Sequence, residues 1–308
     1  MKRNRFFLVF LLPVALWVLA LPAQATPIEA QGTAQYEYGA LGESDADAGA
    51  VDSGIAYADA KVETPVGSPG YGLARSKAAA TGSDDYGAFV AARAYTRTGR
   101  VSMSPEATAT DTVTVKVQNT GSAGAHYMLD LWTATGIFAL TDQQGDEGLT
   151  STGGASYAMS ITRGAETLWQ SAATFCGSIL SFAAGGDLVS SEGTALSYTT
   201  QAVGDQGTIT FLPYADTLDL GILASGETWD LVLNFTLNSW VDSNAVTIMD
   251  ARFGRPALLS GYPGDDEGFG MAVRSLDDVA HAPEPGTLSL LGLVLAGLGA
   301  ARARKQKV

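Results

Sequence analysis

Strict alternation of apolar and polar residues is the feature that most limits how this chain can fold. In Trp229–Leu237 every odd-numbered residue is large and apolar, whereas Asp230, Asn234 and Thr236 point to the opposite side. A period of two is that of a β-strand with one buried face. Between Thr26 and Ala282 no segment of useful length has the helical period of 3.6 residues. We therefore expect a body made of β-strands.

Other segments alternate in the same way, and turn sequences separate two pairs of them. In Glu106–Val117 valines occupy one face and threonines the other. One predicted hairpin joins Tyr157–Ile161 to Thr167–Phe175 around Arg163–Glu166. A second joins Asp216–Ile222 to Trp229–Leu237 through Ala224–Glu227. Further predicted strands are His126–Trp132, Thr208–Leu212 and Ala245–Phe253.

Three runs in the first third of the body alternate alanine and other small residues with larger ones. They are Ile55–Val62, Leu73–Ala80 and Ala88–Thr96. Alanine favours helices by intrinsic propensity, but Gly, Ser and Pro bound each run and aromatic residues alternate within two of them, so we predict strands. Small inward side chains would let a second sheet approach closely. The whole pattern predicts an all-β, two-sheet antiparallel sandwich, jelly-roll-like or immunoglobulin-like, with a parallel β-helix as the alternative.

The composition excludes several classes of function. A formal net charge of −14 over 308 residues would repel nucleic acid, whose binding needs a cationic surface. One cysteine and two histidines allow no intramolecular disulfide and no zinc site built from nitrogen and sulfur ligands. The chain also lacks the G-x-S-x-G, H-E-x-x-H, P-loop and dinucleotide-binding motifs. We expect a protein that is not an enzyme, with a glycan hydrolase as the alternative that the many carboxylates leave open.

The N-terminus has the three parts of a secretory signal peptide. Basic residues in Met1–Arg5 precede an apolar run from Phe6 to Leu21, and Ala23 and Ala25 form an A-x-A cleavage site. We expect residues 1–25 to form a signal helix that the Sec machinery uses and a signal peptidase removes. The mature chain would then begin at Thr26.

The C-terminus also has three parts, which follow an expected body of residues 26–263 and an acidic tether of residues 264–282. Pro283-Glu284-Pro285 precedes an uncharged run, Thr287–Ala301, which as a helix is about 22 Å long against the ~30 Å of a bilayer core. Such a transmembrane helix is short enough to be a transient anchor. Residues 302–308 form a basic tail that should stay in the cytoplasm. Its stop-transfer charges are Arg302, Arg304, Lys305 and Lys307.

This tail resembles the PEP-CTERM sorting signal of Gram-negative bacteria, which some naming schemes call an ice-binding protein C-terminal motif. The resemblance covers Ala282 onward, and the tail departs from the pattern only in its spaced Arg and Lys residues. It implies that an integral-membrane exosortase recognises and processes the chain at Pro283, Glu284 and Pro285. It also implies a setting in the envelope and exopolysaccharide of a biofilm-forming bacterium. The protein would be held briefly in the inner membrane, then reach the cell surface or extracellular matrix.

Two features of the body suggest a ligand. Glu43–Asp52 offers Asp45, Asp47 and Asp52 around a glycine, as loops that bind Ca²⁺ do, although the bidentate glutamate of an EF-hand is missing. No other cofactor is expected. Four tryptophans invite a carbohydrate platform, for which Trp240 is the best exposed candidate, while Trp229 should lie in the core. The alternative function is therefore a carbohydrate-binding module, with or without calcium.

Overall fold

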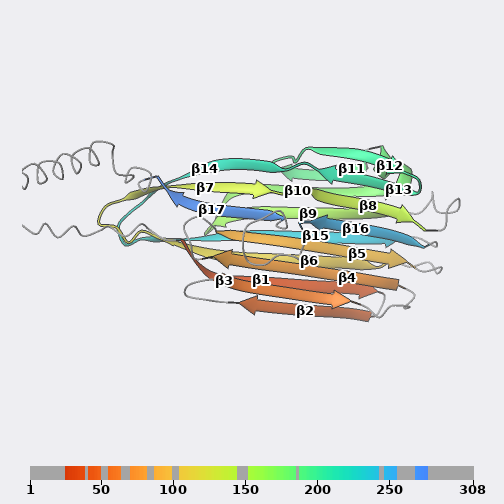
Figure 1. Cartoon of the computed structure of the whole chain (residues 1–308), viewed down its shortest axis with the longest axis horizontal. Helices are drawn as coiled ribbons and strands as arrows, with labels where there is room; N and C mark the ends of the chain where they lie inside the picture. Colours follow the sequence, from red (N-terminus) through yellow and green to blue (C-terminus); the bar gives the residue numbers. More distant parts are fainter. Residues whose placement is uncertain are drawn as a thin grey trace, which may run out of the picture.

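The computed structural model describes ten stretches of the chain, and these stretches are almost entirely β-strand (Figure 1). They are residues 25–38, 41–49, 55–63, 70–81, 87–98, 104–143, 152–184, 187–242, 246–254 and 268–276. Within them the one α-helix is a single turn, α1 (Ile179–Ala183), capped by Ser178. Two sheets lie face to face with their strands running along the same long axis (Figure 1).

The first sheet has seven strands, which in spatial order run from the upper to the lower side of Figure 1. They are β11 (Asp187–Gly193), β10 (Glu166–Ser178), β9 (Thr152–Arg163), β15 (Thr228–Asp242), β6 (Glu106–Gln118), β1 (Ala25–Tyr38) and β2 (Leu41–Gly49). Every pairing between them is antiparallel.

The second sheet has ten strands, several of which line up end to end. They are β12 (Tyr198–Val203), β13 (Gln206–Phe211), β14 (Tyr214–Leu223), β8 (Gly136–Asp142), β7 (Ala125–Thr133), β16 (Thr247–Phe253), β17 (Phe269–Ser275), β5 (Ala88–Thr98), β4 (Gly70–Thr81) and β3 (Ile55–Glu63). These pairings are antiparallel too. The described residues therefore fit the predicted sandwich, and the parallel β-helix is wrong because no described pair is parallel.

The end-to-end arrangement makes the second sheet as wide as the first. β4 covers one edge of β5 over its whole length, so β16 and β17 must share the other edge, and they pair with its two halves in turn. Beyond them β8 pairs with β16 and β7 with β17, and then β13 pairs with β8 and β14 with β7. Pro213 stands between β13 and β14, where a residue without an N–H interrupts the ladder.

The core changes in side-chain size from one side of the sandwich to the other. Near the β11 and β12 side, Phe138 and Phe211 of the second sheet interleave with Tyr157 of the first, with ring centroids 4.9 to 6.4 Å apart. Toward the opposite side, fully buried alanines on β5 face fully buried alanines on β6. There the Cα atoms of the two strands come within 8 Å, closer than the ~10 Å usual between packed sheets. The expectation that the alanine runs form strands that allow close approach is confirmed for β5, whose side chains the structure describes.

One predicted hairpin is confirmed and the other is wrong. β9 and β10 form the first, turning through Gly164, whose φ of 58° lies in the left-handed region that glycine favours. The turn Ala224–Glu227 does not join paired strands, because β14 belongs to the second sheet and β15 to the first. It is a cross-sheet arch. Alternation in a sequence shows which face of a strand is buried, but not which strand pairs with it. Here the apolar faces of β14 and β15 point toward each other across the core.

Asn119 fastens this arch to a second arch that joins β6 to β7. The Asn119 side chain is 1% exposed, and its Nδ2 donates to the carbonyl oxygens of Ala123 and Leu223, at 2.8 Å each. Its backbone oxygen accepts from Gly226 at 2.8 Å, and its N–H donates to Glu227 at 3.1 Å. One buried amide thus satisfies the backbone of both cross-sheet connections at one end of the sandwich.

The segment expected to be a polar tether, residues 264–282, contains a central strand. Phe269–Ser275 forms β17, which lies between β7 and β5 and buries Phe269, Met271 and Val273. Its inward alternation is only seven residues long and stands in an acidic surrounding, which concealed it in the sequence. The body therefore extends past residue 263 to Leu276 at least.

We predict that a chain ending at Glu267 does not form the sandwich, whereas one ending at Ala282 does. Removing β17 takes away three buried apolar side chains, which contribute about 6 kcal/mol at ~2 kcal/mol each, and this is comparable to the whole stability of a domain. Cooperative thermal unfolding followed by near-ultraviolet circular dichroism distinguishes the two chains. A cooperative transition at the same temperature in both would show that β17 is dispensable.

Candidate functional site

The predicted sorting residues lie outside the described part of the chain. This holds for Pro283, Glu284 and Pro285, for Arg302, Arg304, Lys305 and Lys307, and for Ala23. Their roles, and the two terminal helices, stay predictions. Ala25, at the expected cleavage site, is the first residue of β1 and pairs with Val117. Among the described residues, no helix has the length and apolar composition needed to cross a bilayer.

The expected calcium loop is a strand over most of its length. Asp45 and Asp47 lie two residues apart on β2, both exposed, and Asp52 lies outside the described residues. Asp45 Oδ2 accepts from the backbone N–H of Lys61 on β3 at 2.8 Å, so it ties together the edge strands of the two sheets. Asp47 Oδ1 accepts from the N–H of Ala48 at 3.0 Å. Within the described ranges no group of three or more His, Cys, Asp or Glu is arranged around a metal position, and the calcium hypothesis stays a prediction.

Trp240 and Trp132 each pack over a glycine of the neighbouring strand. Trp240 on β15 is opposite Gly154 on β9, and Trp132 on β7 is opposite Gly270 on β17. A Cβ at either glycine would collide with the facing indole. Both tryptophans are half-buried. Each therefore fills the gap that its neighbouring glycine leaves in the sheet surface.

Trp229 is half-buried at the end of the core, not enclosed in it as the alternation suggested. Arg163 covers it, with its guanidinium carbon 4.8 Å from the ring centre. The same guanidinium pairs with Glu166 at 2.8 Å and donates to the carbonyl oxygen of Leu220 at 2.8 Å. This arginine links the first sheet to β14 of the second. Cys176 is half-buried and forms no disulfide.

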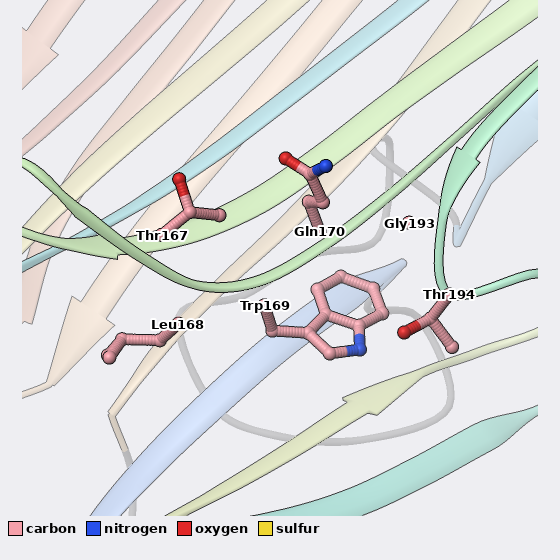
Figure 2. Close-up of a pocket in the computed structure, with 6 residues that line it drawn as sticks. All are labelled: Thr167, Leu168, Trp169, Gln170, Gly193 and Thr194. Atoms are coloured by element: carbon pink, nitrogen blue, oxygen red, sulfur yellow. The ribbon is translucent and has the colours of Figure 1, made fainter.

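A pocket of about 490 Å³ opens where β11 stops short of the end of β10 (Figure 2). β11 pairs with β10 only from Ser171 onward, and Thr194 continues the contact by donating its N–H to the carbonyl oxygen of Gln170 at 2.8 Å. Six residues line the pocket: Thr167, Leu168, Trp169, Gln170, Gly193 and Thr194. The first four are consecutive residues of β10, Gly193 is the last residue of β11, and Thr194 follows it.

Two backbone irregularities shape this pocket. The register between β10 and β9 shifts between Thr167 and Trp169, so Leu168 is an extra residue of a bulge. Gly193 has a φ of 70°, and a Cβ there would collide with the backbone of Gln170. Glycine is therefore needed for the chain to turn close against β10.

Trp169 forms the base of the pocket, and 6% of its surface is exposed. Tyr214 stacks on its ring at 6.0 Å, and the ring of Phe269 is 5.3 Å away. Figure 2 shows the nitrogen edge of the indole turned toward Thr194. Burial and, after it, the hydrogen bond to Asp216 raise the pKa of Tyr214, whereas the hydrogen bonds that its hydroxyl accepts from Trp169 and Thr194 lower it in part. The indole N–H of Trp169 is therefore directed at the hydroxyl of Tyr214.

The lining has the chemistry of a binding site rather than of an acid–base catalyst. It offers hydroxyls, a carboxamide, an indole N–H and one aliphatic side chain, none of which titrates near neutral pH. Gln170 is held in place by Glu192, to which its Nε2 donates at 3.2 Å. Apart from Trp169, one of the four tryptophans, no pattern in the sequence indicated this site, because the two parts of its wall meet only in the folded sheet.

Two pairs of titratable groups lie on β7, β14 and β17. Asp130 accepts from Arg274 Nε at 2.7 Å and from the Thr217 hydroxyl at 2.7 Å. Burial raises the pKa of Asp130, but these hydrogen bonds outweigh burial and leave it lowered. His126 and Asp219 pair at 2.5 Å, and the pKa of Asp219 is lowered by that contact and by the N–H of Gly221. Both pairs brace strands of the second sheet and lie apart from the pocket residues in sequence and strand.

We predict that Arg274→Gln raises the pKa of Asp130 toward the ordinary aspartate value of about 3.9. The pKa is lowered in the folded protein, so the stabilising effect is present above about pH 4 and is lost as the pH falls through the folded value. The variant should therefore lose less of its unfolding free energy on acidification than the original protein. Carboxyl ¹³C NMR titration measures the shift. Arg252→Gln, which removes an exposed arginine on β16, serves as the control and should leave Asp130 unchanged.

Comparison with known proteins identifies one segment of the chain. Residues 281–305 match the PEP-CTERM protein-sorting motif. No curated protein and no solved structure matches the chain. The matched segment includes Pro283, Glu284 and Pro285, the uncharged run, and the basic residues as far as Lys305. The chain is thus a β-rich protein that carries a PEP-CTERM sorting motif at its C-terminus.

Proposed function

We propose that this is a non-enzymatic protein of the cell surface or extracellular matrix, exported through the Sec machinery and sorted by an exosortase. The motif at residues 281–305 is the observation that carries the proposal. Its basic residues keep the end of the chain in the cytoplasm, and its uncharged run holds the chain in the inner membrane for a time. Pro283, Glu284 and Pro285 are then presented on the outer side, where the exosortase acts.

The exported body is suited to association with secreted polysaccharide. The net charge of −14 understates its acidity, because seven of the 18 basic residues lie in the signal peptide and in the tail after residue 301. A strongly acidic surface keeps an extracellular protein soluble, and cations can bridge it to a matrix. The biofilm of a Gram-negative bacterium is the setting that we propose on these grounds.

Replacing Glu284 by Ala should leave the protein unprocessed and associated with the membrane. The change removes the one carboxylate of the tripeptide and leaves both prolines, the anchor and the basic tail in place. Immunoblots of membrane and medium fractions from the exporting cell measure the result. Glu267→Ala, the same change upstream of the motif, is the matched control and should be processed normally. Export of the Glu284→Ala protein at the original level would contradict the sorting proposal.

A calcium-dependent carbohydrate-binding module is the second candidate. Asp45 and Asp47 support it, since both are exposed on the same edge strand and can present oxygens to a cation. This candidate predicts that millimolar Ca²⁺ raises the melting temperature and releases or absorbs heat on titration. Asp47→Asn should abolish both effects, whereas Asp230→Asn, at an exposed position on β15, should retain them. A glycan array run with and without EDTA would then separate calcium-dependent binding from a purely structural role.

A further inference from the structure

We propose that two copies of this chain dimerise by pairing their β12 strands edge to edge. The proposal adds an interaction surface to the protein and does not depend on calcium, on a carbohydrate ligand or on the sorting motif. It rests on three properties of the described residues: an open strand edge, the absence of charge along that edge, and a group of exposed apolar side chains beside it.

The open edge belongs to the last strand of the second sheet. β12 has β13 on one side and no described strand on the other. All six of its residues are exposed, so the strand extends past the core and neither of its faces is covered. An edge of this kind presents backbone N–H and C=O groups with which another strand can pair.

The hydrogen bonds to β13 show which backbone groups of β12 are directed outward. Beyond the last strand pair, the N–H of Leu212 donates to the carbonyl oxygen of Ser197 at 2.8 Å. Along an antiparallel ladder, residues that bond to the neighbouring strand alternate with residues whose N–H and C=O point the other way. The odd-numbered residues of β12 therefore bond to β13, whereas Tyr198, Thr200 and Ala202 direct their backbone groups to the open edge.

Charge favours a second copy of the chain as the partner. The described sheets end in β2, β3, β11, β12 and β14. Of these strands, β12 is the one without an acidic or basic residue, and the uncharged stretch runs from Gly193 to Gly204. Copies with a net charge of −14 repel each other at edges that carry carboxylates, and a basic partner would be drawn to those edges. An uncharged edge suits an uncharged strand, and β12 is itself such a strand.

A twofold axis at Thr200 gives the fullest pairing. Thr200 then faces Thr200 of the second copy, and Tyr198 faces Ala202, so every outward-directed residue takes part in a hydrogen-bonded pair. Moving the axis to Gln201 would place Tyr198 opposite Gly204, which lies beyond the strand with a φ of 57°. Because the two copies contribute the same strand, the contact closes as a dimer and does not continue into a fibre.

Exposed apolar side chains gather at the same corner of the sandwich, where β11, β12 and β13 lie together (Figure 1). Seven large apolar side chains are exposed in the described part of the chain, and six of them are on β11, on β12, on α1 or directly after β13. They are Leu180, Leu188, Val189, Tyr198, Val203 and Leu212. α1 contacts both β12 and β13. A gathering of exposed apolar residues is typical of a protein interface, and pairing through β12 would cover part of it.

Sedimentation equilibrium of the full chain in density-matched detergent tests the proposal, with a mass of 31.8 kDa for one copy. We expect a monomer–dimer equilibrium that tightens as the salt concentration rises from about 50 to about 500 mM, because salt screens the repulsion between acidic bodies. Thr200→Asp places two carboxylates opposite each other and should weaken dimerisation at least about tenfold. Thr200→Val keeps the strand and should dimerise normally. Ser44→Asp adds the same charge at an exposed position of β2 and is the matched control.

A disulfide tests the register. In a Cys176→Ser background, Thr200→Cys places two thiols across the axis, where the Cα atoms of a hydrogen-bonded pair lie about 5.5 Å apart, within the range that a disulfide spans. Gln201→Cys is the matched control, because two residues at this position are diagonal neighbours about 7 to 8 Å apart. After mild oxidation, non-reducing gels should show at least about tenfold more covalent dimer for Thr200→Cys than for Gln201→Cys.

Other results would overturn the proposal. A chain that stays monomeric at the highest soluble concentration has no such interface. A dimer that Thr200→Asp leaves unchanged, or that Thr200→Asp and Ser44→Asp weaken equally, is formed through another surface. A dimer that dissociates as salt rises depends on ion pairs, which β12 cannot supply. Equal cross-linking at positions 200 and 201 would show chance collision instead of a defined register.

Discussion

The two sheets can face each other across their full width because the size of the inward side chains changes from one side of the sandwich to the other. Aromatic rings on β8, β9 and β13 hold the sheets apart near the β11 and β12 edges. Buried alanines on β5 and β6 bring them together on the other side. Sheets held a uniform distance apart would produce clashes on the first side or cavities on the second, each costing about 1 kcal/mol or more per residue.

Alternation in the sequence predicted the long, half-buried strands and could not predict their partners. Trp229–Leu237 and Asp216–Ile222 have one apolar face each, and that pattern is the same whether they pair side by side or face each other through the core. β11 and β12 went unrecognised because every one of their residues is exposed, so neither strand has a buried face to create a period. The pocket was equally hidden, since the bulge at Leu168 and the turn at Gly193 take effect only when β10 and β11 meet.

The predicted targeting segments and the folded body occupy different parts of the chain. The charges and apolar runs that direct it to and through the membrane stand at its two ends, where simple patterns suffice and can be read without a structure. The pocket depends instead on an indole, two hydroxyls and a carboxamide that come from two segments of the chain. That placement requires the whole sheet to form. This difference explains why the sorting motif can be recognised in the sequence and the pocket cannot.

The central position of β17 has a mechanical consequence. The sorting motif begins at residue 281, five residues beyond Leu276, and five residues span at most about 18 Å. Any pull from an anchored or enzyme-bound tail therefore reaches β17 almost directly. Since β17 has β7 along one side and β5 on the other, two ladders of hydrogen bonds share that load. An edge strand in the same place would have one ladder to resist the pull, whereas β17 joins the tail to the sandwich through ladders on both of its sides.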